Sequence, residues 1–164
     1  MNQSLQSVTP VRITQGEPPP RIAIVASGWH RDIVDCALTA MMQTFARSRV
    51  SDHLVERFDV PGAFEIPLVA QRLARSGRYD AIVACALVVN GGIYRHEFVA
   101  SAVIDGLMRV QIDTGTPVLS AVLTPRDFHE HDEHRRFFRE HFVTKGAEVA
   151  RACLDTIARH RALA

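Results

Sequence analysis

Residues 79–89 read YDAIVACALVV, an almost continuous apolar run that ends just before the pair Gly91-Gly92. A run of this kind is typical of a β-strand covered on both faces, as in the middle of a parallel sheet. Three shorter β-branched or alternating runs lie on either side of it, at residues 21–27, 55–60 and 117–123. We therefore predict that residues 79–89 form the central strand of a four-stranded sheet.

Helical spacing of apolar residues follows each of these runs. Apolar side chains recur every three or four residues in segments 34–45, 66–73 and 99–110. After the fourth run we expect two helices, a charged one from about Asp127 and a last one that includes Ile157. Strands that alternate with helices predict an α/β fold, here a single domain of three α/β/α layers with a parallel sheet and right-handed crossovers.

Length and composition set the size of this domain. The chain has 164 residues, of which 47% are hydrophobic and 23% charged, enough for one compact core. Residues 1–20 are polar and end in Gly16-Glu17-Pro18-Pro19-Pro20, so we predict an N-terminal arm followed by a domain at 21–164. The arm could be disordered or could extend the sheet of a neighbouring subunit as an edge strand.

Charge and cysteine content argue against several classes of protein. The formal net charge is +1, so no general attraction to nucleic acid or to an anionic membrane is expected. The chain has no apolar stretch of transmembrane length, and residues 1–14 lack the pattern of a secretory signal, so we expect a soluble protein inside the cell. Its three cysteines are far apart and suggest no disulfide framework, which favours a reducing cytoplasm.

Ligands of parallel α/β sheets bind beyond the carboxyl ends of the strands, so we compared the residues that follow each run. Trp29 follows the first run, where its ring could stack on a flat ligand or pack in the core. Glu65 follows the second run at the start of a helix. It could pair with the helix dipole or bind a polyol, and the two readings are about even.

The third run is followed by Gly91-Gly92 and Arg95, at the start of a predicted helix. Glycine N–H groups, a helix N-terminus and a guanidinium together suit a phosphate, although a simple tight turn would also explain the glycines. The segment matches neither GxGxxG nor a P-loop, so a dinucleotide or nucleoside triphosphate is not indicated.

The fourth run is followed by three histidines, at positions 129, 131 and 134. His131 and His134 could share a helix face, but the HExxH pattern is absent and we predict no metal site. Lys145-Gly146 is interpreted as the start of the terminal helix, where the lysine could reach a site or lie in solvent.

From about Arg21 to the last helix, the sequence resembles the 6,7-dimethyl-8-ribityllumazine synthase family. The resemblance rests on five motifs: Val25-Ala26-Ser27 with Trp29, VPGAFEIP at 60–67, Gly91-Gly92, Pro117 with Val122-Leu123-Thr124, and Lys145-Gly146. The wording GGIYRHEF and the histidine-rich fourth helix are most similar to the second type of the family, which is associated with decamers.

The resemblance implies a flavodoxin-like fold and a transferase of riboflavin biosynthesis. It would condense 5-amino-6-(D-ribitylamino)uracil with 3,4-dihydroxy-2-butanone 4-phosphate, without metal or organic cofactor, in a homopentamer or decamer with sites at subunit interfaces. The implied substrate-binding residues are Trp29 and His30 at the pyrimidine, Ala63, Phe64 and Glu65 at the ribityl chain, Leu87, Val88 and Val89 at the ring, Gly92 and Ile93 at the phosphate, and Lys145 near the heterocycle.

Three positions depart from the family pattern. Arg95 occupies the place of the usual catalytic histidine and His96 follows it, while His134 occupies the place of the usual phosphate-binding arginine. We therefore hypothesise that Arg95 holds phosphate and that His134 of a neighbouring subunit moves the proton, with His96 as a third catalytic candidate. Ser120 replaces an aromatic residue that usually reaches across the subunit interface.

Two other functions fit the same residues. The chain could be a non-catalytic flavin or lumazine binder that lost turnover through these departures, or a protein whose main role is to form a shell. Residues 136–144, interpreted as a longer link between the last two helices, argue against a sixty-subunit capsid and favour the decamer.

Overall fold

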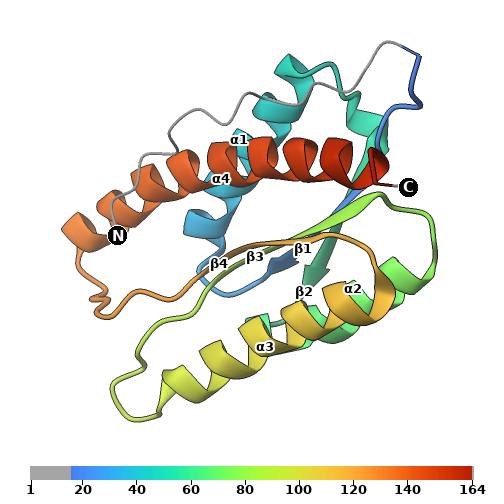
Figure 1. The fold of residues 1–164 in the computed structure, drawn as a ribbon. Helices are drawn as coiled ribbons and strands as arrows, with labels where there is room; N and C mark the ends of the chain where they lie inside the picture. The colour runs from blue at the N-terminus through green and yellow to red at the C-terminus, as the bar shows by residue number, and fades with distance from the viewer. Residues whose placement is uncertain (1–15, 164) are drawn as a thin grey trace.

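The structure is a computed structural model that describes residues 16–163 (Figure 1). Strands and helices alternate along this range. They are β1 (Ile22–Ser27), α1 (Arg31–Arg47), β2 (Val55–Val60), α2 (Ile66–Arg75), β3 (Ala81–Leu87), α3 (His96–Thr114), β4 (Val118–Leu123) and α4 (Asp132–Arg161), with short 3₁₀ helices η1 (Asp52–Leu54) and η2 (Ala63–Glu65) before β2 and α2.

All strand pairs are parallel, and the strand order is β2-β1-β3-β4, the order of flavodoxin-like sheets. Helices α1 and α4 cover one face and α2 and α3 the other (Figure 1), which confirms the predicted three layers. All seven residues of β3 are buried, so the prediction of a strand covered on both faces is confirmed.

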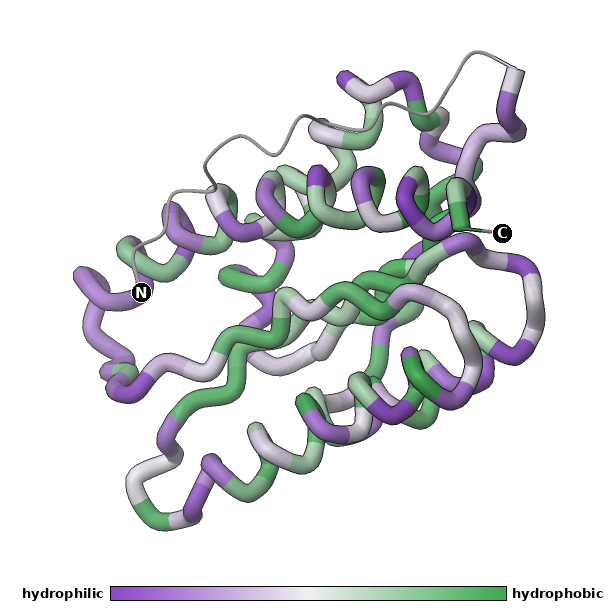
Figure 2. Tube along the Cα trace, viewed as in Figure 1, coloured by the Kyte–Doolittle hydropathy of each residue, from purple (hydrophilic) through white to green (hydrophobic). Residues whose placement is uncertain are grey.

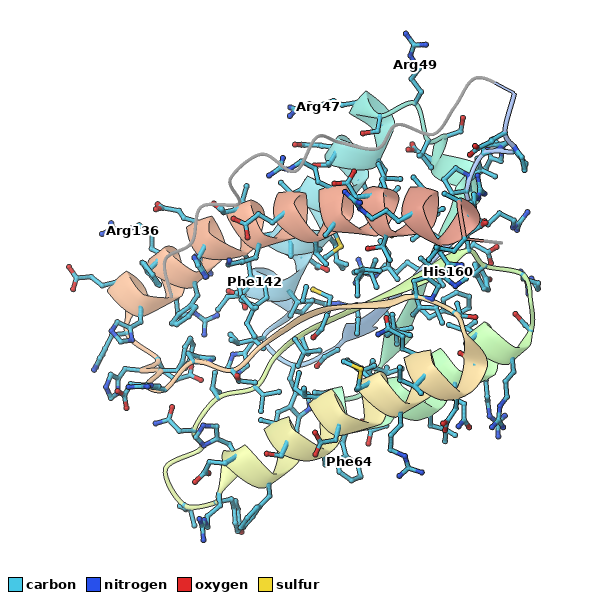
Figure 3. All side chains as sticks on the ribbon, in the orientation of Figure 1. Arg47, Arg49, Phe64, Arg136, Phe142 and His160 are labelled. Atoms are coloured by element: carbon cyan, nitrogen blue, oxygen red, sulfur yellow. The ribbon has the colours of Figure 1, made fainter. Side chains whose placement is uncertain are left out.

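The sheet separates two hydrophobic cores, and its strands carry the most apolar part of the chain (Figure 2). Phe45 of α1 and Phe142 of α4, the latter labelled in Figure 3, are the largest of the fully buried side chains on one side. Full burial of a side chain of this size contributes roughly 1.5–3 kcal/mol. The layer formed by α1 and α4 is therefore a major source of stability.

The end of the chain differs from the prediction. Instead of two helices, α4 runs without interruption from Asp132 to Arg161. Gly146 lies inside this helix, where an added Cβ would meet backbone atoms of Ala37 in α1. The interpretation of Lys145-Gly146 as a helix start is thus wrong, because the glycine serves close helix packing. Residues 136–144 are helical rather than a link, so the argument against a capsid loses its basis.

Of the predicted arm, only residues 16–20 are described, and they contain no strand. Arg161 at the end of α4 holds this segment, because its guanidinium donates to the carbonyl oxygen of Pro18 at 2.8 Å and to Asp80 at 2.7 Å. The rest of the arm, with its possible edge strand, lies outside the described residues. None of the helices between residues 16 and 163 is long and apolar enough to cross a membrane.

Candidate functional site

Backbone hydrogen bonds bring the four strand exits to one edge of the sheet. The N–H of Gly28 after β1 donates to the carbonyl oxygen of Val60 at 2.8 Å. The N–H of Val88 after β3 donates to the carbonyl oxygen of Leu123 at 2.9 Å. The residues selected from the sequence at these exits therefore share the edge at which parallel sheets bind ligands.

Trp29 lies on the surface of this edge. Its side chain is 71% exposed, so the alternative of a core tryptophan is excluded, and its backbone N–H donates to Ser27 Oγ at 3.2 Å. His30 adopts a left-handed backbone conformation, with φ 50°, directly before α1. Its ring meets the edge of Phe128 at 5.2 Å between centroids. An exposed indole beside a fixed imidazole can stack on a flat heterocycle.

The second exit forms η2, in which Glu65 stabilises the turn. Its Oε2 accepts the N–H of Gly62 at 2.8 Å, as in a capping box. Oε2 of Glu65 therefore has a structural role at the start of the helix, and Oε1 of the same carboxylate is the atom available to a ligand hydroxyl. Ala63 is partly buried, whereas Phe64 is 64% exposed (Figure 3).

The third exit places the two glycines in a loop rather than at a helix end. Helix α3 begins at His96, so Gly92 lies four residues before it, with a positive φ of 74° that favours glycine. The segment after the third strand therefore opens a helix as expected, with the glycines in the loop before it. Leu87 and Val88 are buried and Val89 partly so, and the N–H of Val88 is already bonded within the sheet edge.

Arg95, His96 and Glu97 form a small charged cluster at the start of α3. One Glu97 oxygen lies 3.7 Å from Arg95 Nε, and the other lies 3.3 Å from His96 Nδ1. A backbone hydrogen bond, together with the charges of His96 and Arg95, lowers the pKa of Glu97. The Arg95 guanidinium also stands over the ring of Phe98 at 4.6 Å. With Nδ1 turned to the carboxylate, Nε2 of His96 is the nitrogen that can exchange protons with a ligand.

At the fourth exit, His134 in the first turn of α4 is held by the loop that precedes this helix. Its Nδ1 accepts the N–H of His129 at 3.2 Å, so a neutral His134 carries its proton on Nε2. His131 precedes α4 as its N-cap residue and does not share a helix face with His134, contrary to the expectation. Among residues 16–163, no group of three or more histidine, cysteine or acidic side chains is placed to hold a metal ion.

Two contacts that sequence reasoning missed hold this region together. Asp32 in the first turn of α1 accepts from Arg135 at 2.8 Å and from Arg139 at 2.6 Å, which fixes the start of α4. Burial would raise the pKa of Asp32, but the two arginines outweigh it and lower the pKa. Asn90 Oδ1 accepts the N–H of Phe128 at 3.0 Å and joins the third exit to the fourth.

Two predicted residues do not reach this edge within their own chain. Ser120 is exposed in the middle of β4, the strand at the border of the sheet. Lys145 pairs with Glu148 at 2.8 Å, at a point about 20 Å along α4 from its start. Both side chains could serve a site only if that site belonged to a neighbouring subunit.

Comparison with known proteins gives a consistent result. Residues 19–161 match the model of the family described as 6,7-dimethyl-8-ribityllumazine synthase. A protein of that name from Rhodococcus erythropolis is 58% identical over 143 residues, which cover 87% of this chain and 92% of that protein. Proteins named 6,7-dimethyl-8-ribityllumazine synthase 2 are 58% identical in Bradyrhizobium diazoefficiens (85% of this chain, 83% of that protein) and 47% identical in Pseudomonas syringae pv. tomato (92% and 88%). The chain therefore belongs to the 6,7-dimethyl-8-ribityllumazine synthase family of riboflavin-biosynthesis transferases.

Proposed function

We propose that this chain condenses 5-amino-6-(D-ribitylamino)uracil with 3,4-dihydroxy-2-butanone 4-phosphate to 6,7-dimethyl-8-ribityllumazine, releasing phosphate and water without a metal or organic cofactor. The observation that carries the proposal is the exposed Trp29 ring at the same sheet edge as the Gly91-Gly92 loop. One element suits a flat pyrimidine, and the other suits a phosphate.

The pyrimidine half of the site is assigned to the first two exits. Trp29 stacks on the ring beside His30, and η2 supports the ribityl chain through Ala63, Phe64 and Glu65. Because Oε2 of Glu65 holds the turn, Oε1 is the acceptor that we assign to a ribityl hydroxyl. The third exit adds backbone groups to the ring. Since the N–H of Val88 is already bonded, those groups are the carbonyls of Leu87 and Val88 and the N–H of Val89.

The phosphate half is assigned to Gly92, Ile93 and Arg95, and we assign the proton transfer to His96. The Glu97 carboxylate lies 3.3 Å from His96 Nδ1 and would orient the imidazole ring. Amine addition to the ketone, phosphate loss and ring closure need the two substrates held together with modest acid–base help. A single well-placed histidine contributes roughly 10²–10⁴-fold to such steps.

His134 is assigned a different role from the one hypothesised from the sequence. Its Nδ1 lone pair accepts the His129 N–H, so taking up a proton there would break that hydrogen bond. Its Nε2–H remains a donor and suits the phosphate of a neighbouring site. His96→Ala should therefore lower kcat with both substrates saturating, whereas His134→Ala should leave kcat nearly unchanged and raise KM for the butanone phosphate. A loss of kcat in His134→Ala, with kcat kept in His96→Ala, would instead assign the proton transfer to His134.

Product absorbance tests the activity itself. Purified protein is mixed with both substrates, and formation of dimethylribityllumazine is compared with the slow uncatalysed condensation. Acceleration that depends on protein concentration is the expected result. If the rate is unchanged but the product quenches Trp29 fluorescence, the non-catalytic binder is the better description.

The surface supports an oligomer. Seven large apolar side chains are exposed over η2, α2 and α3, more than an isolated subunit would leave in water. They are Phe64, Leu68, Phe98, Val99, Ile104, Met108 and Ile112. We propose a pentamer formed through this face, in which Ser120 and Lys145 serve neighbouring sites.

We further propose that pentamers pair into a decamer, as the second-type resemblance implies, and two relatives carry the name synthase 2. Light scattering should then give about 180 kDa, ten times the 18.2 kDa of one chain. A particle of about a megadalton would overturn the decamer. We place the reaction in the cytoplasm, since Cys36, Cys85 and Cys153 are free thiols.

A further inference from the structure

The loop between β4 and α4 is attached to the body of the protein at one buried side chain. Residues 124–131 form no helix or strand, and Phe128 is their only buried member, at 5% exposed. Its ring meets His30 at 5.2 Å and Phe138 at 5.4 Å between centroids. Phe128 therefore anchors an otherwise exposed loop between the start of α1 and the first turns of α4.

Asn90 fixes the backbone of the same residue. Its Oδ1 accepts the N–H of Phe128 at 3.0 Å, across 38 positions of sequence. Asn90 directly precedes Gly91-Gly92, so one side chain ties the loop with the glycines to the loop that leads to His134. Without this acceptor the backbone N–H of Phe128 would lack a hydrogen-bond partner in a partly buried environment, which would cost free energy of folding.

We propose that Asn90 is a positioning residue for the condensation: by holding Phe128 it sets where His30 stands relative to the Gly91-Gly92 loop. The proposal rests on the proposed function, because it assigns the two held elements to the pyrimidine and to the phosphate. Asn90 itself touches neither substrate. Its effect is expected on the alignment of the two bound substrates, for which a displacement of about 1 Å can cost about 100-fold in rate.

Two variants separate the hydrogen bond from the rest of the side chain. Asn90→Ala removes the acceptor, whereas Asn90→Asp keeps an oxygen at the same reach. We expect Asn90→Ala to lower kcat by about 10- to 100-fold with both substrates saturating, and Asn90→Asp to stay within about threefold of wild type. Saturation matters because the added charge of aspartate would repel a phosphate and raise its KM. Pyrimidine affinity, read from Trp29 fluorescence, should be unchanged in both.

Limited trypsin digestion reports the loop independently of catalysis. Arg126 is exposed two residues before Phe128, so release of the loop should speed cleavage between Arg126 and Asp127 in Asn90→Ala but not in Asn90→Asp. If Asn90→Ala does not fold, Asn90→Ser, whose hydroxyl is too short to reach the N–H, replaces it.

The outcomes are distinct. An unchanged kcat in Asn90→Ala, or an equal loss in Asn90→Ala and Asn90→Asp while the loop stays protected from trypsin, would overturn the positioning role. A wild-type protein that forms no lumazine would instead refute the proposed function. The trypsin comparison would then still decide whether Asn90 holds the loop.

Discussion

Helices α1 and α4 cross closely enough that the crossing point tolerates only glycine, and this can be tested by Gly146→Ala. A Cβ at Gly146 would fall closest to the carbonyl oxygen of Ala37, and would lie 2.8 Å from its Cα and 2.9 Å from its carbonyl carbon. All three are backbone atoms of Ala37, a fully buried residue of α1. No side-chain rotation can relieve the overlap, so the two helices must move apart.

The size of the effect follows from two opposing contributions. Alanine in place of glycine inside a helix normally gains about 1 kcal/mol through propensity. Overpacking a well-packed core costs about 1–3 kcal/mol, and a clash with backbone belongs at the upper end or beyond. We therefore expect a net loss of about 2 kcal/mol, which in a domain of this size lowers Tm by about 4–8 °C.

Thermal unfolding followed by circular dichroism, at one fixed protein concentration because the oligomer contributes to stability, measures this shift. Gly91→Ala is the control, since no atom lies within 4 Å of its added Cβ, and its Tm should stay near that of wild type. Ala37→Gly should not rescue Gly146→Ala, because the clashing atoms belong to the backbone. A Gly146→Ala protein that melts at or above the wild-type Tm would refute the reasoning.

Three further predictions concern charge, thiols and the stacking ring. Because the pKa of Asp32 is lowered in the folded protein, its ion pairs stabilise the fold fully at pH values above the ordinary pKa of 3.8, and this stabilisation is lost as the pH falls through the folded pKa. Asp32→Asn should therefore lower Tm at neutral pH, and the difference from wild type should disappear in acid. Burial raises the pKa of Cys85 and of Cys153 to about 12, so a thiol reagent should titrate only the partly exposed Cys36 before unfolding and all three thiols afterwards. Trp29→Ala should raise KM for the pyrimidine with little change in KM for the butanone phosphate, and Trp29→Phe should recover most of the loss; equal effects on both substrates would argue against stacking.

The strands were the most predictable part of the fold. The run at 79–89 contains β3 at Ala81–Leu87, and the run at 55–60 coincides with β2. A strand covered on both faces must be apolar at every position, while a border strand alternates, and both patterns can be read directly from the sequence. In a parallel sheet the carboxyl ends of all strands lie at one edge, so the sequence alone predicts that Trp29 and Gly92 lie at the same edge.

Helix α4 could not be predicted correctly, because glycine is locally a helix breaker. Its cost of about 1 kcal/mol at Gly146 is small beside the burial of residues such as Phe142 and Ile157 along the same helix. Tertiary packing thus overrides a local signal, and nothing in the residues around 145–146 reveals the partner helix. The hydrogen bond from the backbone N–H of His129 to His134 Nδ1 is likewise formed in a loop and has no signal in the sequence.

The contacts that organise the site join residues that are distant in sequence. Asp32 reaches Arg135 across 103 positions, and Asn90 reaches Phe128 across 38. Charged and amide side chains at such positions are usually read as solvated surface, since most of them are. Phe128, an aromatic residue in the charged segment after Thr124, is the one feature of the sequence that indicates that this loop packs against the protein.

The two parts of the proposed site differ in how many contacts hold them in place. The proposed pyrimidine side rests on the α1–α4 layer, which is held by the close crossing at Gly146 and by the ion pairs of Asp32. The loop proposed to bind phosphate has far less support, because Ile93 and Tyr94 are 84% and 83% exposed. Its order must come from Asn90 at one end and, beyond that, from bound phosphate or a neighbouring subunit. Separating the α1–α4 layer should therefore weaken pyrimidine binding first, whereas losing the Asn90 hydrogen bond should impair turnover first.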